Sequence, residues 1–286
     1  MNISKTRFIN WTRCPMYFPM DLKFNPTGKA DIDDERERRE ERLAELREGV
    51  KSSDGFDAED EEFDAQPGPE LEALLPYYNK VEEEALKVAK KYFRGTFIAN
   101  SKDVHGQKLF EYELHGHTYR CYVDIYNENE EEINIIEVKA TTNSKYTDAK
   151  AGLFFSDKRG GTKYPLFVKE GNIWRLNALA STKTDYAAKN YEAKKGLLLD
   201  RYSNYGKYPH DLAFQRYVIE HALRKAGDNR PVNFYLAVLN SEYAFDGTRD
   251  ANGDCVYNEM GGHELIKFLD MNEETQVEQT PTLAEI

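Results

Sequence analysis

Two apolar runs separated by a charged turn, each carrying acidic side chains, constrain the fold of this chain more than any other feature. The first run is Tyr119–Tyr126, with Asp124 near its end. The second run is Ile133–Ala140, which contains Glu137. Runs of this length that are rich in Ile, Val and Tyr are typical of β-strands, and the polar stretch between them is typical of a turn. The pattern therefore predicts a hairpin that brings the two acids to neighbouring strand ends.

The side chains of this hairpin have the chemistry of a combined cation and phosphate site. Two carboxylates, the backbone carbonyl of Val138 and the ammonium of Lys139 can hold a hard divalent cation beside a phosphate, because such cations prefer oxygen ligands. A lysine next to the metal can orient the attacking water and offset phosphate charge. The alternative is a hairpin whose charged side chains face solvent or blunt a sheet edge.

The hairpin residues and four further segments resemble the RecB-like branch of the PD-(D/E)XK nuclease superfamily, and within it a bacterial domain family of unknown function. The further segments are the opening helix with Cys14-Pro15, an acidic helix at 81–92, the helix around Gln215 and the strand that begins at Val232. The resemblance covers about residues 1–24 and 80–270. It implies an α/β fold, an α+β sandwich with a mixed central sheet flanked by helices, whose restriction-endonuclease-like core carries helical and hairpin insertions.

The resemblance also implies roles for individual residues. Asp124 and Glu137 would bind Mg²⁺ or Mn²⁺, with the carbonyl of Val138 completing the set. Lys139 would position the nucleophilic water and offset charge on the phosphate. Gln215 would orient Lys139 or the phosphate.

The acidic helix before the hairpin offers one more metal contact, because related nucleases often place a His or Glu there. Glu82, Glu83 and Glu84 are consecutive, so they point in three directions and at most two can face the site. From its distance to the end of the helix we expect Glu84 to bind the metal directly or through water, with Glu83 as second choice. The alternative is a solvated acidic face.

The three cysteines, Cys14, Cys121 and Cys255, are spaced too widely for a disulfide framework or a zinc pattern. Cys14 resembles the first ligand of the iron–sulfur cluster in some RecB-like and CRISPR-adaptation nucleases. Such clusters use four thiolates, so an iron–sulfur cluster is not expected here. The Cys14-Pro15 pair would then be structural.

Charge is distributed unevenly along the 286 residues, whose formal net charge is −12. Residues 31–66 hold sixteen acidic and six basic side chains, a net of −10, whereas residues 139–216 hold fifteen basic and seven acidic ones, a net of +8. A local basic surface is what phosphate neutralisation needs, although a lysine-rich stretch can also be a solvated face. The expected nucleic-acid contacts on this segment are Lys189, Lys194, Lys195 and Arg201. Aromatic rings interleaved with them, which would favour single-stranded DNA or frayed ends by stacking, are Tyr186, Tyr191, Tyr202 and Tyr205.

The domain organisation follows from composition and periodicity. We expect an N-terminal helix and Cys-Pro turn at 1–30, an acidic charged helix and linker at 31–69, a core at 70–270 with a basic insertion at about 150–207, and a polar tail at 271–286. Helices are predicted over 3–13 with Ser4 as N-cap and Arg7 exposed, over 71–93, over 183–202, and over 211–226 with Asp211 as a cap. Strands are predicted over 96–100, 109–115, 118–126, 133–140 and 232–239, with a further hairpin turning at Glu170-Gly171.

We therefore expect a nuclease that depends on Mg²⁺ or Mn²⁺ and hydrolyses DNA by in-line attack of water, in DNA repair or in defence against phages and mobile elements. The alternative is a non-cleaving nucleic-acid-binding or scaffold subunit. A protein partner, or a C-terminal domain missing from this chain, could supply specificity. No apolar run approaches the roughly 18–20 residues of a membrane helix, and the first residues do not form a secretory signal, so we expect no membrane association and a cytoplasmic location.

Overall fold

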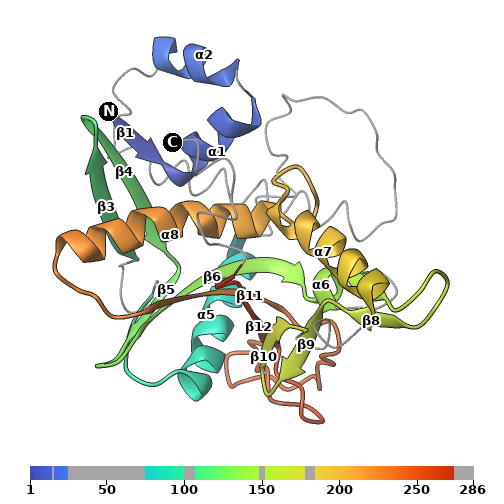
Figure 1. Cartoon of the computed structure of the whole chain (residues 1–286). Helices are drawn as coiled ribbons and strands as arrows, with labels where there is room; N and C mark the ends of the chain where they lie inside the picture. Colours follow the sequence, from blue (N-terminus) through green and yellow to red (C-terminus); the bar gives the residue numbers. More distant parts are fainter. Residues whose placement is uncertain (15, 25–74, 100–106, 148–151, 178–183, 274–286) are drawn as a thin grey trace.

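The computed structural model describes residues 1–14, 16–24, 75–99, 107–147, 152–177 and 184–273 (Figure 1). Its helices are α1 (Lys5–Arg13), α2 (Tyr17–Phe24), α5 (Leu75–Tyr92), α6 (Ser144–Thr147), α7 (Asp185–Leu199) and α8 (Lys207–Lys225). Its strands are β1 (Asn2–Ser4), β2 (Thr96–Ala99), β3 (Lys108–Leu114), β4 (His117–Val123), β5 (Ile125–Glu128), β6 (Ile133–Thr142), β7 (Phe154–Ser156), β8 (Lys163–Pro165), β9 (Phe167–Glu170), β10 (Ile173–Leu176), β11 (Val232–Leu239) and β12 (Ile266–Asp270). The predicted acidic segment 31–69 lies outside the described residues, as does the tail from residue 274.

A seven-stranded sheet forms the centre of the molecule, in the order β2-β5-β6-β11-β12-β10-β9. Strands β6 and β11 are parallel, as are β10 and β12, whereas the other neighbours are antiparallel. The middle strands β6 and β11 are buried through most of their length, as expected for strands covered on both faces. This mixed sheet flanked by helices confirms the predicted α+β sandwich.

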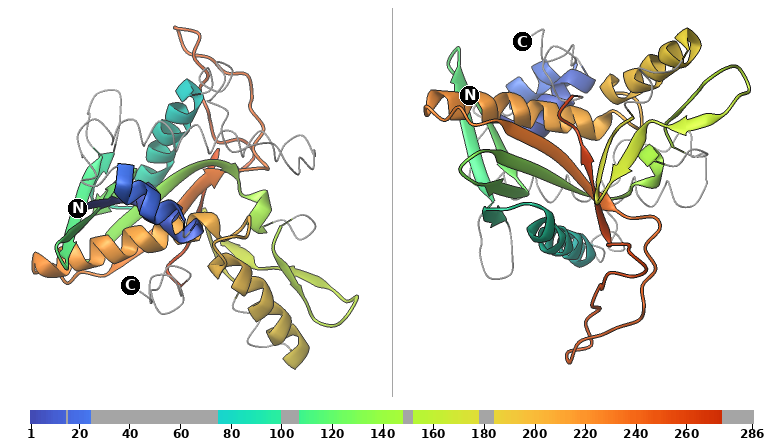
Figure 2. Two further views of the ribbon diagram at one scale, coloured as in Figure 1. Left: turned by 90° about the horizontal axis from the view of Figure 1, so that it is seen from above. Right: turned by 60° about the horizontal axis from the view of Figure 1, so that its bottom comes forward.

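Helices cover both faces of this sheet (Figures 1 and 2). Helix α5 buries Ala85, Val88 and Ala89 against one face, in a cluster with residues of β5, β6, β11 and β12. Helix α8 lies across the other face, where ten of its residues are buried, six of them in the larger of the two cores. A helix with so much buried surface is held by tertiary packing more than by its own propensity. The two helices therefore fix which side chains of β6 face which core.

The predicted strand 118–126 is in fact two strands. Strand β4 ends at Val123 and belongs to a three-stranded sheet in the order β1-β4-β3, whereas β5 begins at Ile125 and belongs to the seven-stranded sheet. The chain changes sheets at Asp124, and the continuous apolar pattern across the junction hid this break. The hairpin with β6 is confirmed, since β5 and β6 pair antiparallel from Ile125–Ile136 to Glu128–Ile133.

Two expectations about the helices are wrong. Helix α8 begins at Lys207 rather than Asp211, so its N-cap residue is Gly206, and Asp211 is buried inside the first turns. Arg7 is buried rather than exposed, because its guanidinium bonds Asp21 and the carbonyl of Asn2. The predicted N-cap of α1 is confirmed: the Ser4 hydroxyl accepts a hydrogen bond from the Arg7 amide.

The basic insertion contributes a hairpin, a short two-stranded sheet and α7. The hairpin β9–β10 turns at Gly171, whose φ of 63° explains the glycine there, as predicted. Strands β7 and β8 form a separate pair against which α7 packs. These elements lie beside the N-terminal end of α8 (Figure 1).

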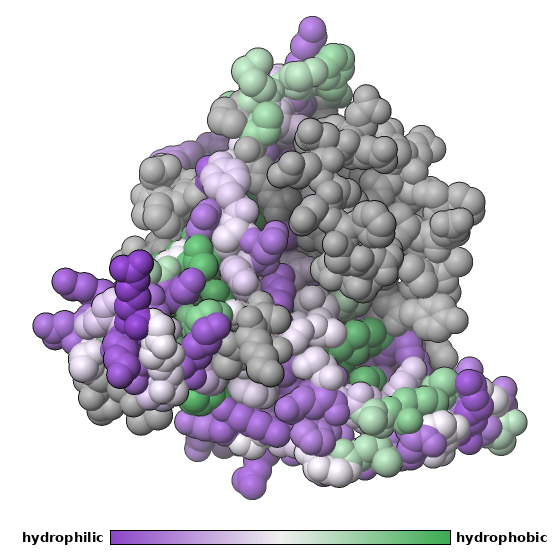
Figure 3. Space-filling model, turned by 90° about the vertical axis from the view of Figure 1, so that its right-hand side faces the viewer, coloured by the Kyte–Doolittle hydropathy of each residue, from purple (hydrophilic) through white to green (hydrophobic). Residues whose placement is uncertain are grey.

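Helix α2 presents an apolar surface at the top of the molecule (Figure 3). Its exposed large side chains, together with one from the preceding turn, are Met16, Tyr17, Phe18, Met20 and Phe24.

Within the part of the chain that the structure describes, no helix is long and apolar enough to span a membrane.

Candidate functional site

Asp124 sits where the chain passes from the small sheet to the large one. Its Oδ2 accepts a hydrogen bond from the Val138 amide at 2.9 Å, and its Oδ1 accepts one from Gln107 Nε2 at 2.9 Å. The bond to Val138 ties the carboxylate to β6 immediately after Glu137. The break between β4 and β5 therefore places one acid of the predicted pair against the strand that carries the other.

Glu137 is the centre of a buried charged cluster. Its Oε1 accepts from Lys5 Nζ at 2.8 Å and lies 2.9 Å from Lys139 Nζ. Its Oε2 accepts from Gln215 Nε2 at 2.6 Å. The side chains of Glu137 and Lys139 are almost fully buried, and that of Lys5 is 13 % exposed. Both carboxylate oxygens are thus held by donors from three different elements.

Strand alternation explains how these side chains meet. Ile136 and Val138 pack in the core under α5, so Glu137 and Lys139 point to the opposite face. There α8 supplies Gln215 and α1 supplies Lys5. The register of β6 with β11 shifts just after Lys139, and such bulges are common next to functional sites.

Burial and charge set the protonation of the two acids in opposite directions. Burial, then the carboxylates of Glu137 and Glu82, raise the pKa of Asp124 well above its usual range, although Lys139 and Lys5 act the other way. Burial also disfavours the charged form of Glu137, but Lys139, Lys5 and the hydrogen bonds from Lys5 and Gln215 outweigh it and lower its pKa. A buried carboxylate that is costly to ionise beside an ionised one is typical of a cation or proton site.

On α5 the acid whose charge acts on Asp124 is Glu82. Glu84 instead contacts lysines of its own helix, with Lys87 Nζ at 2.7 Å and Lys80 Nζ at 3.7 Å from its Oε1. Residues two apart on a helix point to nearly opposite sides, so Glu82 and Glu84 cannot both face the site. Distance from the helix end could not reveal this, since it depends on how α5 is rotated against the sheet.

The donor set fits a hard cation in chemistry, although within the described residues no three acidic, histidine or cysteine side chains are grouped as a ready metal site. The carboxylates of Glu137 and Glu82 both act on that of Asp124, against the ammonium groups of Lys139 and Lys5. Gln215 Oε1 is buried and has no hydrogen-bond partner among the described residues. An orphaned acceptor of this kind calls for a donor such as a bound water.

Lysine ammonium groups gather next to this cluster, at the N-terminal end of α8. The Nζ atoms of Lys139, Lys145 and Lys207 lie 5.5, 4.4 and 5.7 Å from the centre of the Tyr208 ring. The N-cap residue Gly206 gives the helix no side-chain cap. Ammonium groups at a helix N-terminus create a positive potential that favours anions.

The residues predicted to bind nucleic acid lie on α7 and just after it. Lys189 is exposed, Lys194 Nζ lies 5.7 Å from the centre of the Phe154 ring, and Lys195 pairs with Glu273. Arg201 donates to the Tyr202 hydroxyl at 2.8 Å. They belong to the basic insertion, and among the described residues no hydrogen bond or ion pair joins them to Glu137.

The rings proposed for base stacking differ in exposure. Tyr186 and Tyr202 are exposed, at 46 % and 65 %. Tyr191 is buried against Phe155, so its assignment as a stacking platform is wrong. Tyr205 is half-buried beside Tyr146.

The cysteines lie in three separate elements. Cys14 is exposed after α1, Cys121 is buried in β4, and Cys255 is half-buried in the connection between β11 and β12.

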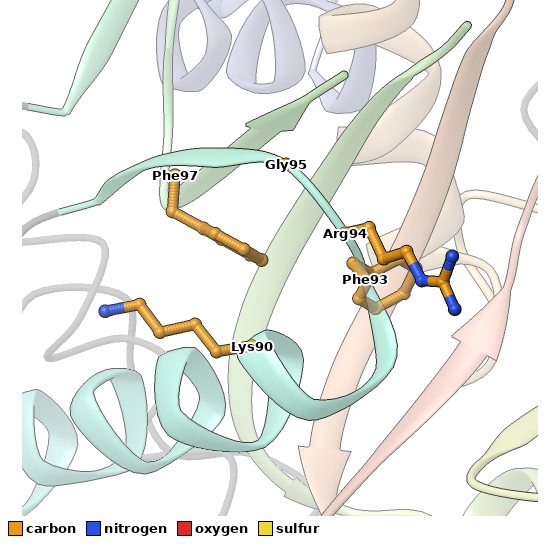
Figure 4. A pocket seen from close by; sticks show the side chains of 5 residues that line it. All are labelled: Lys90, Phe93, Arg94, Gly95 and Phe97. Atoms are coloured by element: carbon orange, nitrogen blue, oxygen red, sulfur yellow. The ribbon is translucent and has the colours of Figure 1, made fainter. Parts of the chain in front are cut away.

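A pocket of about 530 Å³ lies at the C-terminal end of α5 (Figure 4). Lys90 and Arg94 line it with Phe93 and Phe97, but the two cationic side chains point away from each other. It adjoins Gly95, next to the end of β5 that is remote from Asp124. The two cationic groups therefore do not point to a common ligand position, and the pocket is separate from the Glu137 cluster.

The structure thus brings together Asp124, Glu137, Val138, Lys139 and Gln215, and leaves Glu84 and the α7 lysines apart from them. Sequence reasoning missed Lys5 and Gln107 and ranked Glu82 last on α5. Lys5 lies 132 residues before Glu137, so no local spacing connects them. Comparison of the chain with protein-family models, curated proteins and solved structures finds no match.

Proposed function

We propose that the protein is a metal-dependent nuclease of the PD-(D/E)XK type that hydrolyses DNA. One observation carries this proposal: the buried cluster in which Lys139 and Gln215 contact Glu137 while Asp124 bonds the amide between Glu137 and Lys139. Acids, an ammonium and an amide are the groups needed to hold a cation and a scissile phosphate together. A place in DNA repair or in defence against mobile elements is part of the same proposal.

Each side chain has a defined task in this reaction. Asp124, Glu137 and the carbonyl of Val138 would hold Mg²⁺ or Mn²⁺, and the bound cation would supply Lewis-acid chemistry at the phosphate. Lys139 stays beside Glu137 and offsets the charge that develops on the phosphate oxygens. The Oε1 acceptor of Gln215 would accept a hydrogen bond from the attacking water and so orient the water lone pair toward phosphorus.

The substrate backbone would run past the N-terminal end of α8. Lys145 and Lys207 lie around the Tyr208 ring next to Lys139. Helix α7, which precedes α8 in the chain, would extend this path with Lys189 and Lys194. Lysine side chains along such a path would neutralise successive phosphates without contacting the base edges that carry sequence information. The exposed Tyr202 and Tyr186 along it suit single strands or frayed ends.

Cleavage assays with matched variants test the proposal. The full chain is incubated with labelled single- and double-stranded DNA and RNA in Mg²⁺, Mn²⁺ or EDTA. We expect metal-dependent cleavage of DNA that Lys139→Ala and Asp124→Asn abolish and that Lys225→Ala, an exposed lysine in the last turn of α8, retains. Calorimetry should show Mn²⁺ binding that Asp124→Ala removes. Binding of DNA without cleavage in any metal would refute the nuclease.

A non-cleaving nucleic-acid-binding subunit is the second candidate. It is favoured by the donors around Glu137, since Lys5, Lys139 and Gln215 engage both of its oxygens. In such a protein the ammonium groups would replace the metal permanently. Substitution of Lys145 and Lys207 would then weaken DNA binding, whereas EDTA would change nothing.

A further inference from the structure

Lys5 gives the cluster a second ammonium group on a single carboxylate oxygen. Its Nζ lies 2.8 Å from Glu137 Oε1, and Lys139 Nζ lies 2.9 Å from the same atom. Gln215 holds the other oxygen. The contact depends on the local fold of the N-terminus, where β1 pairs in parallel with β4 and the Ser4 cap starts α1 at Lys5. Lys5 is therefore delivered to the site by an element separate from the strand that carries Glu137.

A divalent cation cannot share this oxygen with two ammonium groups. The cation needs a lone pair of Glu137 Oε1 or Oε2, and like charges in a buried site repel strongly. A cation that takes Oε1 must therefore displace one of its two ammonium groups. Lys139 is nearly fully buried, on the same strand as Glu137, whereas Lys5 is more exposed and comes from another element. Lys5 can withdraw along its flexible four-carbon stem with less rearrangement.

We propose that Lys5 occupies the cation position on Glu137 in the metal-free protein and, once the cation binds, moves to a phosphate oxygen of the nucleic acid. The inference rests on the nuclease function proposed above. In the metal-free protein Lys5 then acts as a charge placeholder: its ammonium group offsets the charge of the buried carboxylates, so that the site stays folded. A lysine suits the second role, because its ammonium is a compact point charge that binds phosphate without a fixed geometry.

The signature of a placeholder is a pair of effects with opposite signs. Replacing Lys5 by the neutral, similarly shaped Met removes the competitor, so Mn²⁺ should bind at least about tenfold more tightly, which equals ~1.4 kcal/mol. The same variant lacks the phosphate contact, so kcat/KM for DNA cleavage should fall by about tenfold or more. A lysine that only supported the fold would weaken metal binding and cleavage together.

Isothermal calorimetry with Mn²⁺ alone and DNA cleavage, on the full chain, separate the outcomes. The control variant is Lys225→Met, which should change neither quantity. If wild type binds Mn²⁺ and cleaves DNA while Lys5→Met binds Mn²⁺ no more tightly, the inference is overturned and the proposed function stands. A wild type that neither binds Mn²⁺ nor cleaves contradicts the proposed function and the inference with it.

A charge-retaining variant covers the case in which Lys5→Met does not fold, as judged by circular dichroism. Lys5→Arg keeps a cation on Glu137 and should bind Mn²⁺ no more tightly than wild type. Where Lys5→Met does fold, the rise in thermal midpoint on adding Mn²⁺ should be larger for it than for wild type or Lys5→Arg. An Arg variant that binds Mn²⁺ more tightly than wild type would overturn the placeholder.

Discussion

The two acids of the candidate site should differ sharply in how much folding free energy is lost when their charge is removed. Glu137 is the counter-ion of two ammonium groups, at 2.8 Å for Lys5 and 2.9 Å for Lys139. Glu137→Gln leaves both without a carboxylate in a site where Lys139 is almost fully buried. Removing one partner of a buried ion pair costs ~3–5 kcal/mol. We expect a loss of unfolding free energy in that range.

Asp124→Asn should cost far less. Burial and the charges of Glu137 and Glu82 raise the pKa of Asp124, so its ionised form disfavours the folded state relative to a neutral side chain. The amide keeps an acceptor for one of the two donors, the Val138 amide or Gln107, and loses the other bond at about 1 kcal/mol. Because Asn is neutral, the substitution also removes the free-energy cost of a buried charge, and this gain offsets the lost hydrogen bond. We expect Asp124→Asn to lie within ~1 kcal/mol of wild type.

Urea unfolding at neutral pH in EDTA, followed by circular dichroism, measures both free energies without metal. The control is Glu113→Gln, an exposed acid on β3, which should change stability by less than ~0.5 kcal/mol. A Glu137→Gln variant as stable as wild type would show that the ammonium groups do not depend on that carboxylate. An Asp124→Asn variant that loses as much as Glu137→Gln would refute the assignment of opposite electrostatic roles.

Two further substitutions test the scaffold around the hairpin. Gly95→Ala should destabilise the fold by ~2–4 kcal/mol in thermal unfolding, because φ at Gly95 is 118° and a Cβ there would lie 2.0 Å from the Glu128 carbonyl oxygen. The control Gly227→Ala should cost less, because Gly227 has a φ of 80° but open space around its Cβ position. Arg230→Met should lower the thermal midpoint at pH 7 by less than Gly95→Ala, because Arg230 bonds both Glu128 and Asp228 at a partly exposed site. These bonds lower the pKa of both carboxyls, so their stabilisation is present above the unfolded pKa values, about 4, and is lost as pH falls through the lower folded values. A difference between Arg230→Met and wild type that does not shrink as pH falls below about 4 would contradict this linkage.

Local sequence determined the elements whose signals lie in consecutive residues. Alternating and β-branched residues predicted the strands that became β5 and β6, and helical periodicity predicted α5, α7 and most of α8. Ser4 as N-cap and the turn at Gly171 were also predictable, because capping and turn geometry depend on a few neighbouring backbone groups. The sequence therefore determined the hairpin and the two acids that it carries.

Only the tertiary structure decided how these elements meet. The break at Asp124 exists because β4 and β5 pair with different partners, which the continuous apolar pattern cannot reveal. The choice of Glu82 over Glu84 depends on the rotation of α5 against the sheet. Lys5 reaches Glu137 because β1 docks beside β4, across 132 residues of chain. Contacts between distant segments are chosen by the packing of whole faces, so no short stretch of sequence encodes them.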